Sequence, residues 1–111
     1  MKKPRNSTVE KFAAAAKHVA PAITRFRLYI AGPSDKSTRA IRHARELCDS
    51  HYKDCFELEV IDILQQPARA REDHVLAVPM LVKHIPLPVK KFIGDLSNHE
   101  TILVGLGISG V

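Results

Sequence analysis

The apolar segment at residues 78–95, VPMLVKHIPLPVKKFIGD, limits most strongly what this chain can fold into, because three prolines interrupt it. A proline inside a helix costs about 3 kcal/mol or more, and a central strand also excludes it. Pro79, Pro86 and Pro88 must therefore lie at the ends of elements. The residues between them suit two short strands, but residues 80–85 also suit a turn or two of helix. Two layouts of similar cost are the condition under which one sequence switches between packings.

Before this segment, the sequence predicts a strand, a helix and a second strand. Residues 25–31 and 56–64 alternate apolar and polar side chains, as half-buried strands do. Between them, apolar residues recur at helical spacing over residues 37–52. Two strands joined through a helix by short connections predict a right-handed crossover and a parallel pair.

The rest of the chain completes an α/β fold. Pro67 suits the first turn of a helix over residues 68–77. The capping-box spacing of Ser97 and Glu100 predicts a terminal helix. If residues 78–95 form two strands, the element order is βαβαββα, which is that of the thioredoxin-like fold. Pro79 then takes the place at which that fold characteristically carries a cis-proline, a bond that exchanges slowly.

The positive charge of the chain is confined to its first residues. Residues 1–25 hold six Lys or Arg and one Glu, which equals the whole net charge of +5, whereas residues 26–111 are neutral. A nucleic-acid-binding domain carries a basic face on its folded part, so we do not expect one here. We expect a basic N-terminal extension over residues 1–24 and one domain over residues 25–111. Within the extension, residues 7–20 suit either a short helix or a frayed tail.

The N-terminus does not predict export or membrane insertion. Residues 1–5, MKKPR, resemble the start of a signal peptide, but the apolar run Phe12–Ala16 is too short and Lys17 interrupts it. No stretch approaches the roughly 18 apolar residues of a membrane-spanning helix. We therefore expect a cytoplasmic protein.

The residue pattern also argues against catalysis. Cys48 and Cys55 are too far apart for a redox pair or a zinc-ligand pair, and residues 31–37, the loop where thioredoxins carry their thiols, contain no cysteine. Ser34 and Ser37 suit helix capping better than nucleophilic attack. Asp62 and Asp95 suit turns. We expect no enzyme activity, no metal and no cofactor.

Four stretches carry a resemblance to a known family. LYIAGPSDKSTRAIR, LEVIDILQQP, REDHVLAVPMLVKHIPLPVKKFIGDLS and ILVGLG resemble the circadian clock protein family KaiB over about residues 25–108. The resemblance implies a metamorphic protein: a ground-state fold of order βαββααβ, often tetrameric, that interconverts slowly with a thioredoxin-like monomer. In that family the monomer docks on KaiC, a RecA-type ring ATPase. In cyanobacteria this docking also recruits KaiA and clock histidine kinases.

The resemblance also implies roles for particular residues. The partner-binding surface would involve the edge of the second strand and the segment after it, with Glu57, Glu59, His74, Lys83, Lys90 and Lys91. The packing switch would depend on Pro79, Pro86, Pro88, Gly105 and Gly107. Solvated charges explain the glutamates and lysines equally well, whereas prolines and glycines are constrained by backbone geometry.

Departures from the family pattern are concentrated at these positions. His74 stands where the family usually has lysine, Glu57 and Glu59 where it has small or basic residues, and Gly107 where it often has an acid. They predict a non-cyanobacterial KaiB-like member that serves a circadian or stress-timing system. The alternatives are a thioredoxin-like sensor module of a histidine-kinase pathway and, third, a redox enzyme. The element at residues 93–97, IGDLS, favours KaiB.

Overall fold

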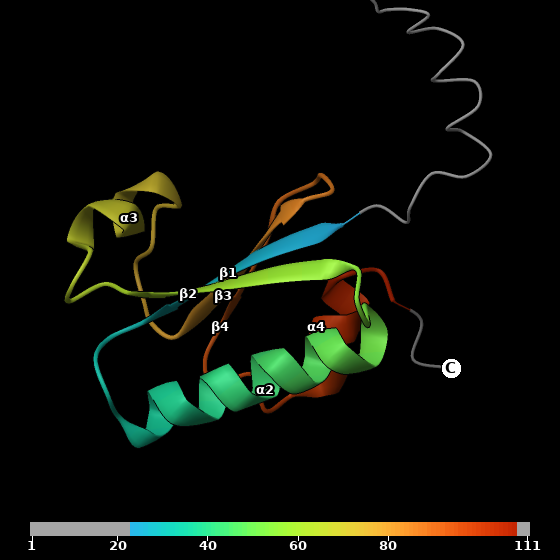
Figure 1. Ribbon diagram of the computed structural model, residues 1–111, viewed down its shortest axis with the longest axis horizontal. Helices are drawn as coiled ribbons and strands as arrows, with labels where there is room; N and C mark the ends of the chain where they lie inside the picture. Colours follow the sequence, from blue (N-terminus) through green and yellow to red (C-terminus); the bar gives the residue numbers. More distant parts are fainter. Residues whose placement is uncertain (1–22, 109–111) are drawn as a thin grey trace, which may run out of the picture.

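A computed structural model describes residues 23–108 of the chain, whose four strands form one mixed sheet (Figure 1). The elements are β1 (Thr24–Ile30), α2 (Asp35–His51), β2 (Phe56–Asp62), α3 (Pro67–Glu72), β3 (Met80–Ile85), β4 (Lys90–Ile93) and α4 (His99–Gly105). The helix considered for residues 7–20 lies outside the described residues. The element order agrees with the thioredoxin-like alternative.

The sheet has the strand order β2-β1-β3-β4. β1 pairs with β2 in parallel, which confirms the predicted crossover through α2. β3 runs antiparallel to β1, and β4 antiparallel to β3. β2 and β4 are therefore the two edges of the sheet, and β1 and β3 are its central strands.

The proline-rich segment takes the two-strand layout in this structure. Pro79 directly precedes β3, while Pro86 and Pro88 lie in the connection to β4. The peptide bonds before all three prolines are cis, which confirms the expectation for Pro79. The prolines thus lie at element ends, as their missing backbone donors require.

The third helix is shorter than predicted. We expected it to extend to Ala77, but α3 ends at Glu72. The reason is local: Asp73 turns its side chain toward the sheet, and His74 adopts a left-handed backbone conformation with φ of 53°. An α-helix cannot continue through that conformation.

Alternation along the strands divides the buried side chains between the two faces of the sheet. Phe26, Leu28 and Ile30 of β1 pack with α2 and α4, where most of the core lies. Ser34 caps α2 as predicted, because its hydroxyl accepts a hydrogen bond of 3.0 Å from the backbone N–H of Ser37. Full burial of one apolar side chain of the size of Phe26, Leu28 or Ile30 stabilises the fold by about 1.5–3 kcal/mol.

The opposite face of the sheet is only partly covered. α3 lies over one end of it (Figure 1), where Tyr29, Ile61, Met80 and Val82 form a smaller buried cluster. The rest of that face presents charged side chains. Within residues 23–108, no helix is long and apolar enough to cross a membrane.

Candidate functional site

A buried aspartate joins α3 to three strands on the partly covered face. Asp73, directly after α3, is only 5% exposed. Its carboxylate accepts hydrogen bonds from the hydroxyl of Tyr29, from Nε2 of His84 at 2.9 Å and from a guanidinium nitrogen of Arg27 at 3.3 Å. Its backbone carbonyl accepts a further bond of 2.6 Å from Nζ of Lys91. We refer to these five residues as the Asp73 cluster.

The cluster changes the proton affinity of its members. Burial alone would raise the pKa of Asp73, but hydrogen bonds from Tyr29 and His84 and the charge of Arg27 outweigh it and lower that pKa. Burial, together with the hydrogen bond to Asp73, raises the pKa of Tyr29 to about 12. At neutral pH, Asp73 is therefore an anion held by donors, and Tyr29 keeps the proton that it donates.

Ion pairs extend this cluster across α3 and β2. Arg27 lies 3.0 Å from Glu72 and 3.6 Å from Glu59, while Arg69 of α3 lies 2.9 Å from Glu59 and 3.4 Å from Glu72. The hydrogen bond from Arg69 lowers the pKa of Glu59. Each of these pairs is partly exposed, so each stabilises the fold only weakly.

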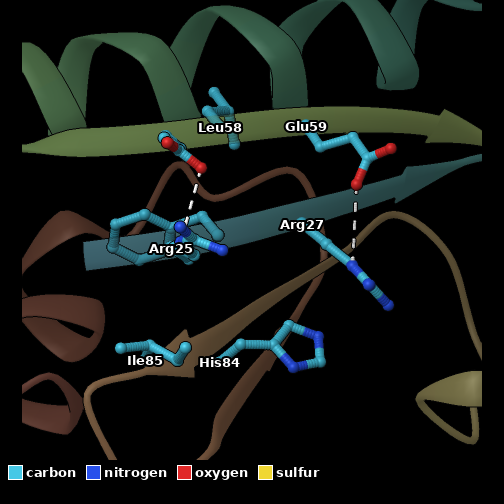
Figure 2. Close-up of a pocket in the computed structure, with 8 residues that line it drawn as sticks. Arg25, Arg27, Leu58, Glu59, His84 and Ile85 are labelled. Atoms are coloured by element: carbon cyan, nitrogen blue, oxygen red, sulfur yellow. Dashed lines mark ion pairs between the residues drawn. The ribbon is translucent and has the colours of Figure 1, made fainter. Parts of the chain in front are cut away.

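Beside the cluster, the sheet face is hollowed into an open groove of about 520 Å³ across β2, β1 and β3 (Figure 2). Arg25 and Glu57 form an ion pair of 3.4 Å across it, and Arg27 pairs with Glu59 farther along. His84 and Ile85 of β3 line its other side. Because each guanidinium already faces a carboxylate, the groove suits contact with another protein better than capture of a small ion.

Three predicted partner-binding residues lie on this side of the molecule. Glu57 and Glu59 project from β2, an edge strand. His74 lies in the turn after α3, beside a second depression of about 430 Å³ that extends to Leu76. Leu76 is 95% exposed, which makes it an unusually accessible apolar side chain. The structure therefore gathers the β2 edge and the segment around α3 on one side of the sheet.

The three predicted lysines do not join them as one surface. Lys83 is only 6% exposed, and its cross-strand partner in the sheet is Lys90. Lys90 is exposed, whereas the ammonium of Lys91 is bonded to the backbone of Asp73. In this arrangement Lys83 offers a partner little surface, and Lys91 already holds α3.

Two glycines implicated in switching lie at the end of α4. A Cβ atom at Gly105 would lie 2.5 Å from Cε1 of Phe92 on β4, so glycine permits the close approach of these two elements. Gly107 has φ of 81°, a conformation that other residues rarely adopt.

The carboxylates considered as catalytic candidates serve turns. Asp62 accepts bonds of 2.9 Å from the backbone N–H groups of Gly32 and Leu64. Asp95 accepts a bond of 3.1 Å from the N–H of Ser97 and pairs with Arg39 at 3.2 Å. Bonds from Ser97, and then the pair with Arg39, lower the pKa of Asp95. The expected turn roles are confirmed.

Sequence reasoning missed the Asp73 cluster. Tyr29 and Asp73 are 44 residues apart, and Asp73 stands in the polar run REDH, which is typical of an exposed turn. Tyr29, on the charged side of an alternating strand, was the one available signal, because a buried tyrosine usually finds a hydrogen-bond partner.

Comparisons with known proteins identify the family to which the sequence is similar. The sequence profile of the KaiB domain matches residues 27–108. Over 82 residues, the chain is 45% identical to the circadian clock oscillator protein KaiB of Prochlorococcus marinus (strain MIT 9312), covering 74% of this chain and 78% of the relative. It is 43% identical to the circadian clock protein KaiB3 of Synechocystis sp. (strain ATCC 27184 / PCC 6803 / Kazusa) over the same length, covering 74% and 80%.

Two solved structures place the fold among thioredoxin-like proteins. The N-terminal domain of Synechococcus elongatus SasA superimposes with a TM-score of 0.65 at 15% identity, over 100% of this chain and 96% of that one. Oxidised mitochondrial thioredoxin 3 of Saccharomyces cerevisiae gives 0.61 at 16% identity, over 86% and 88%. At such identities the likeness concerns the fold alone.

Proposed function

The chain belongs to the KaiB family of circadian clock proteins, and from this we propose that it is a regulatory binding protein that docks on a KaiC-like, RecA-type ring ATPase. Docking would modulate the ATPase and phosphorylation cycle of the ring in a circadian or stress-timing system. In this proposal the chain binds the ring in the cytoplasm and does not itself catalyse a reaction.

The observation that carries this proposal is the extent of the family match. Residues 27–108 include the second half of β1, from residue 27 to residue 30, and every later element of the described fold. The two relatives named as clock proteins also match over 82 residues, at 43% and 45% identity. The β1–α2 loop, by contrast, carries no thiol, and burial raises the pKa of the Cys48 thiol to about 12. Binding therefore explains the domain better than redox chemistry.

The docking surface that we propose centres on α3 and the turn that follows it. Leu64 before α3 and Leu76 after it are 70% and 95% exposed, and His74 lies between them along the chain. Exposed leucines, one of them (Leu76) beside a depression of the surface, are suited to burial against another protein. Glu57 and Glu59 on the β2 edge would extend this surface, whereas Lys90, on the opposite edge strand β4, lies outside it.

Co-elution with a purified KaiC-like ring in ATP and in ADP tests the proposal. We expect the chain to co-elute in one nucleotide state. We expect Leu76→Asp to weaken binding at least about tenfold, because a carboxylate would have to be desolvated at the interface. Arg42→Ala, an exposed change on α2, is the matched control and should bind as the wild type does.

Two other results would count against the proposal. Absence of binding in either nucleotide state would contradict it. Binding to a clock histidine kinase without binding to the ring would support the alternative sensor role in a histidine-kinase pathway.

We further propose that the described arrangement is one of two packings, the other being a ground-state oligomer. Pro79, Pro86, Pro88, Gly105 and Gly107 would permit the exchange. The proposal rests on family membership and on a segment, residues 78–95, whose prolines tolerate either layout.

A further inference from the structure

We propose that Asp73 is a positioning residue: it fixes α3 and the turn at residues 74–76 to the sheet, and so holds the docking surface in place without touching the partner. This inference rests on the proposed function for its docking half. Its structural half concerns the free protein alone.

Few contacts other than those of Asp73 attach α3 to the sheet. The helix has six residues, none of them buried, and Gln66, the N-cap residue before it, makes no side-chain capping bond. Isolated helices of this length are not stable in water. The apolar support comes from partly buried neighbours in the chain, Ile63, Val75 and Val78. Polar contacts must therefore contribute much of the attachment.

Among those polar contacts, the ones at Asp73 dominate. The ion pairs of Glu59 and Glu72 are about half exposed and contribute little each. The carboxylate of Asp73 is 6% exposed and receives several donors. Hydrogen bonds to a buried charge are worth more than neutral or exposed ones, and a buried donor left without its acceptor is costly.

The partners of Asp73 come from three different strands. Arg27 and Tyr29 belong to β1, His84 to β3 and Lys91 to β4. A single residue at the end of α3 therefore sets the distance and direction of the helix relative to the whole sheet. At the opposite end of α3, Gln66 makes no side-chain capping bond, and the backbone N–H groups of Gln65 and Gln66 bond only to the carbonyl of Asp62 at the end of β2.

The position of the docking surface follows from that of Asp73. His74 is the next residue in the chain and Leu76 comes two residues later. The backbone N–H of Val75 bonds to the carbonyl of Ala70 at 2.9 Å, which closes the turn against the last turn of the helix. If Asp73 loses its anchors, the helix end and the exposed Leu76 are no longer held against the sheet.

Hydrogen exchange in the free protein tests the structural half. We expect Asp73→Asn to speed exchange of the Val75 amide at least about tenfold, because the neutral amide turns one donor group toward other donors. Exchange of Leu28 in central β1 should change less than about threefold. Glu72→Gln, which removes only exposed pairs, is the matched control and should leave Val75 within about threefold of the wild type.

Ring binding tests the docking half with Asp73→Asn and a control outside the docking surface. We expect Asp73→Asn to weaken binding about tenfold or more, and Asp49→Asn, the same chemical change at an exposed position of α2, to leave it nearly unchanged. If Asp73→Asn does not fold, a second pair of variants at His84 provides the same test. His84→Gln keeps a donor for Asp73 and should retain both Val75 protection and binding, whereas His84→Ala should lose part of both.

The outcomes separate this inference from the proposed function. Unchanged Val75 exchange in Asp73→Asn overturns the inference by itself. Wild-type binding by a variant whose Val75 protection is lost also overturns it. Failure of the wild-type chain to bind any KaiC-like ring contradicts the proposed function and the docking half together, while the exchange result still decides whether Asp73 fixes α3.

Discussion

At the scale of single residues, the buried groups of the partly covered face have the clearest measurable consequences. A hydrogen bond joins the hydroxyl of Tyr29 to the carboxylate of Asp73, with the proton on the hydroxyl and the negative charge on the carboxylate. Both groups are displaced from their ordinary pKa values in the direction that preserves this state. The contact should therefore persist through the neutral range and fail only toward the extremes of pH.

The lowered pKa of Asp73 predicts a defined acid response. A carboxyl whose folded pKa lies below its ordinary value of 3.8 stabilises the fold above that value, and the contribution is lost as the pH falls through the folded pKa. The difference in unfolding free energy between the wild type and Asp73→Asn should therefore be largest near neutral pH and shrink below about pH 4. Urea unfolding across this range measures it. A difference that stays constant with pH would contradict the assignment of Asp73.

The two thiols should react differently. Burial raises the pKa of Cys48 to about 12, so its thiolate is scarce at pH 8, and the side chain is also fully covered. Cys55 is only partly buried. Titration with a disulfide reagent should show one thiol reacting in the native protein and two after unfolding. Rapid reaction of both native thiols would contradict the packing around Cys48.

At the scale of elements, the contact between α4 and β4 can be tested at Gly105. Replacing a helical glycine by alanine normally stabilises a helix by about 1 kcal/mol. Here the new methyl group would meet the ring of Phe92, and overpacking costs about 1–3 kcal/mol. Gly105→Ala should therefore fail to stabilise the wild-type protein. In a protein that already carries Phe92→Val, the same substitution should raise the free energy of unfolding. Urea unfolding of the four proteins in this cycle measures the coupling, and simple additivity would contradict the contact.

The comparison of elements shows what local pattern can and cannot predict. The βαβ unit was predictable because its strands alternate and its helix has one apolar face. The prolines limited residues 78–95 to two layouts, but the choice between them needed the pairing of β3 with β1 and β4. The end of α3 was mispredicted because Asp73 binds side chains far away in the sequence. Such a long-range contact leaves no local periodic signal.

The candidate site was less predictable than the fold for a similar reason. Glu57, Glu59 and His74 came from resemblance, and the structure places them on one side of the sheet. Lys83 was expected at a binding surface but is buried opposite Lys90. The register of β3 shifts between its pairs with Phe26 and Arg25, and this irregularity brings Ile85 rather than His84 opposite Arg25. An irregularity of this kind cannot be read from the sequence of one strand.

At the scale of the whole molecule, well-buried elements are joined to elements with little buried apolar surface. β1, α2 and β2 hold most of the buried core, whereas α3 depends on polar contacts and β4 is a four-residue edge strand. Elements with few buried apolar contacts open at lower free energy than the core. We therefore expect hydrogen exchange in α3 and β4 to be faster than in β1 and α2. The proposed second packing should appear over residues 65–108 as a second population that interconverts slowly with the first. A single, uniformly protected population would contradict the proposed second packing.

Titration of a KaiC-like ring into isotopically labelled protein, followed by NMR, tests the central claim most directly. The described arrangement is recognised by cross-strand contacts between Met80 and Ile93 and between Leu81 and Phe92. We predict that the ring, in one nucleotide state, binds the population that has these contacts and depletes every other signal from residues 65–108. If no signal of the protein changes with the ring in either ATP or ADP, docking from this arrangement is contradicted.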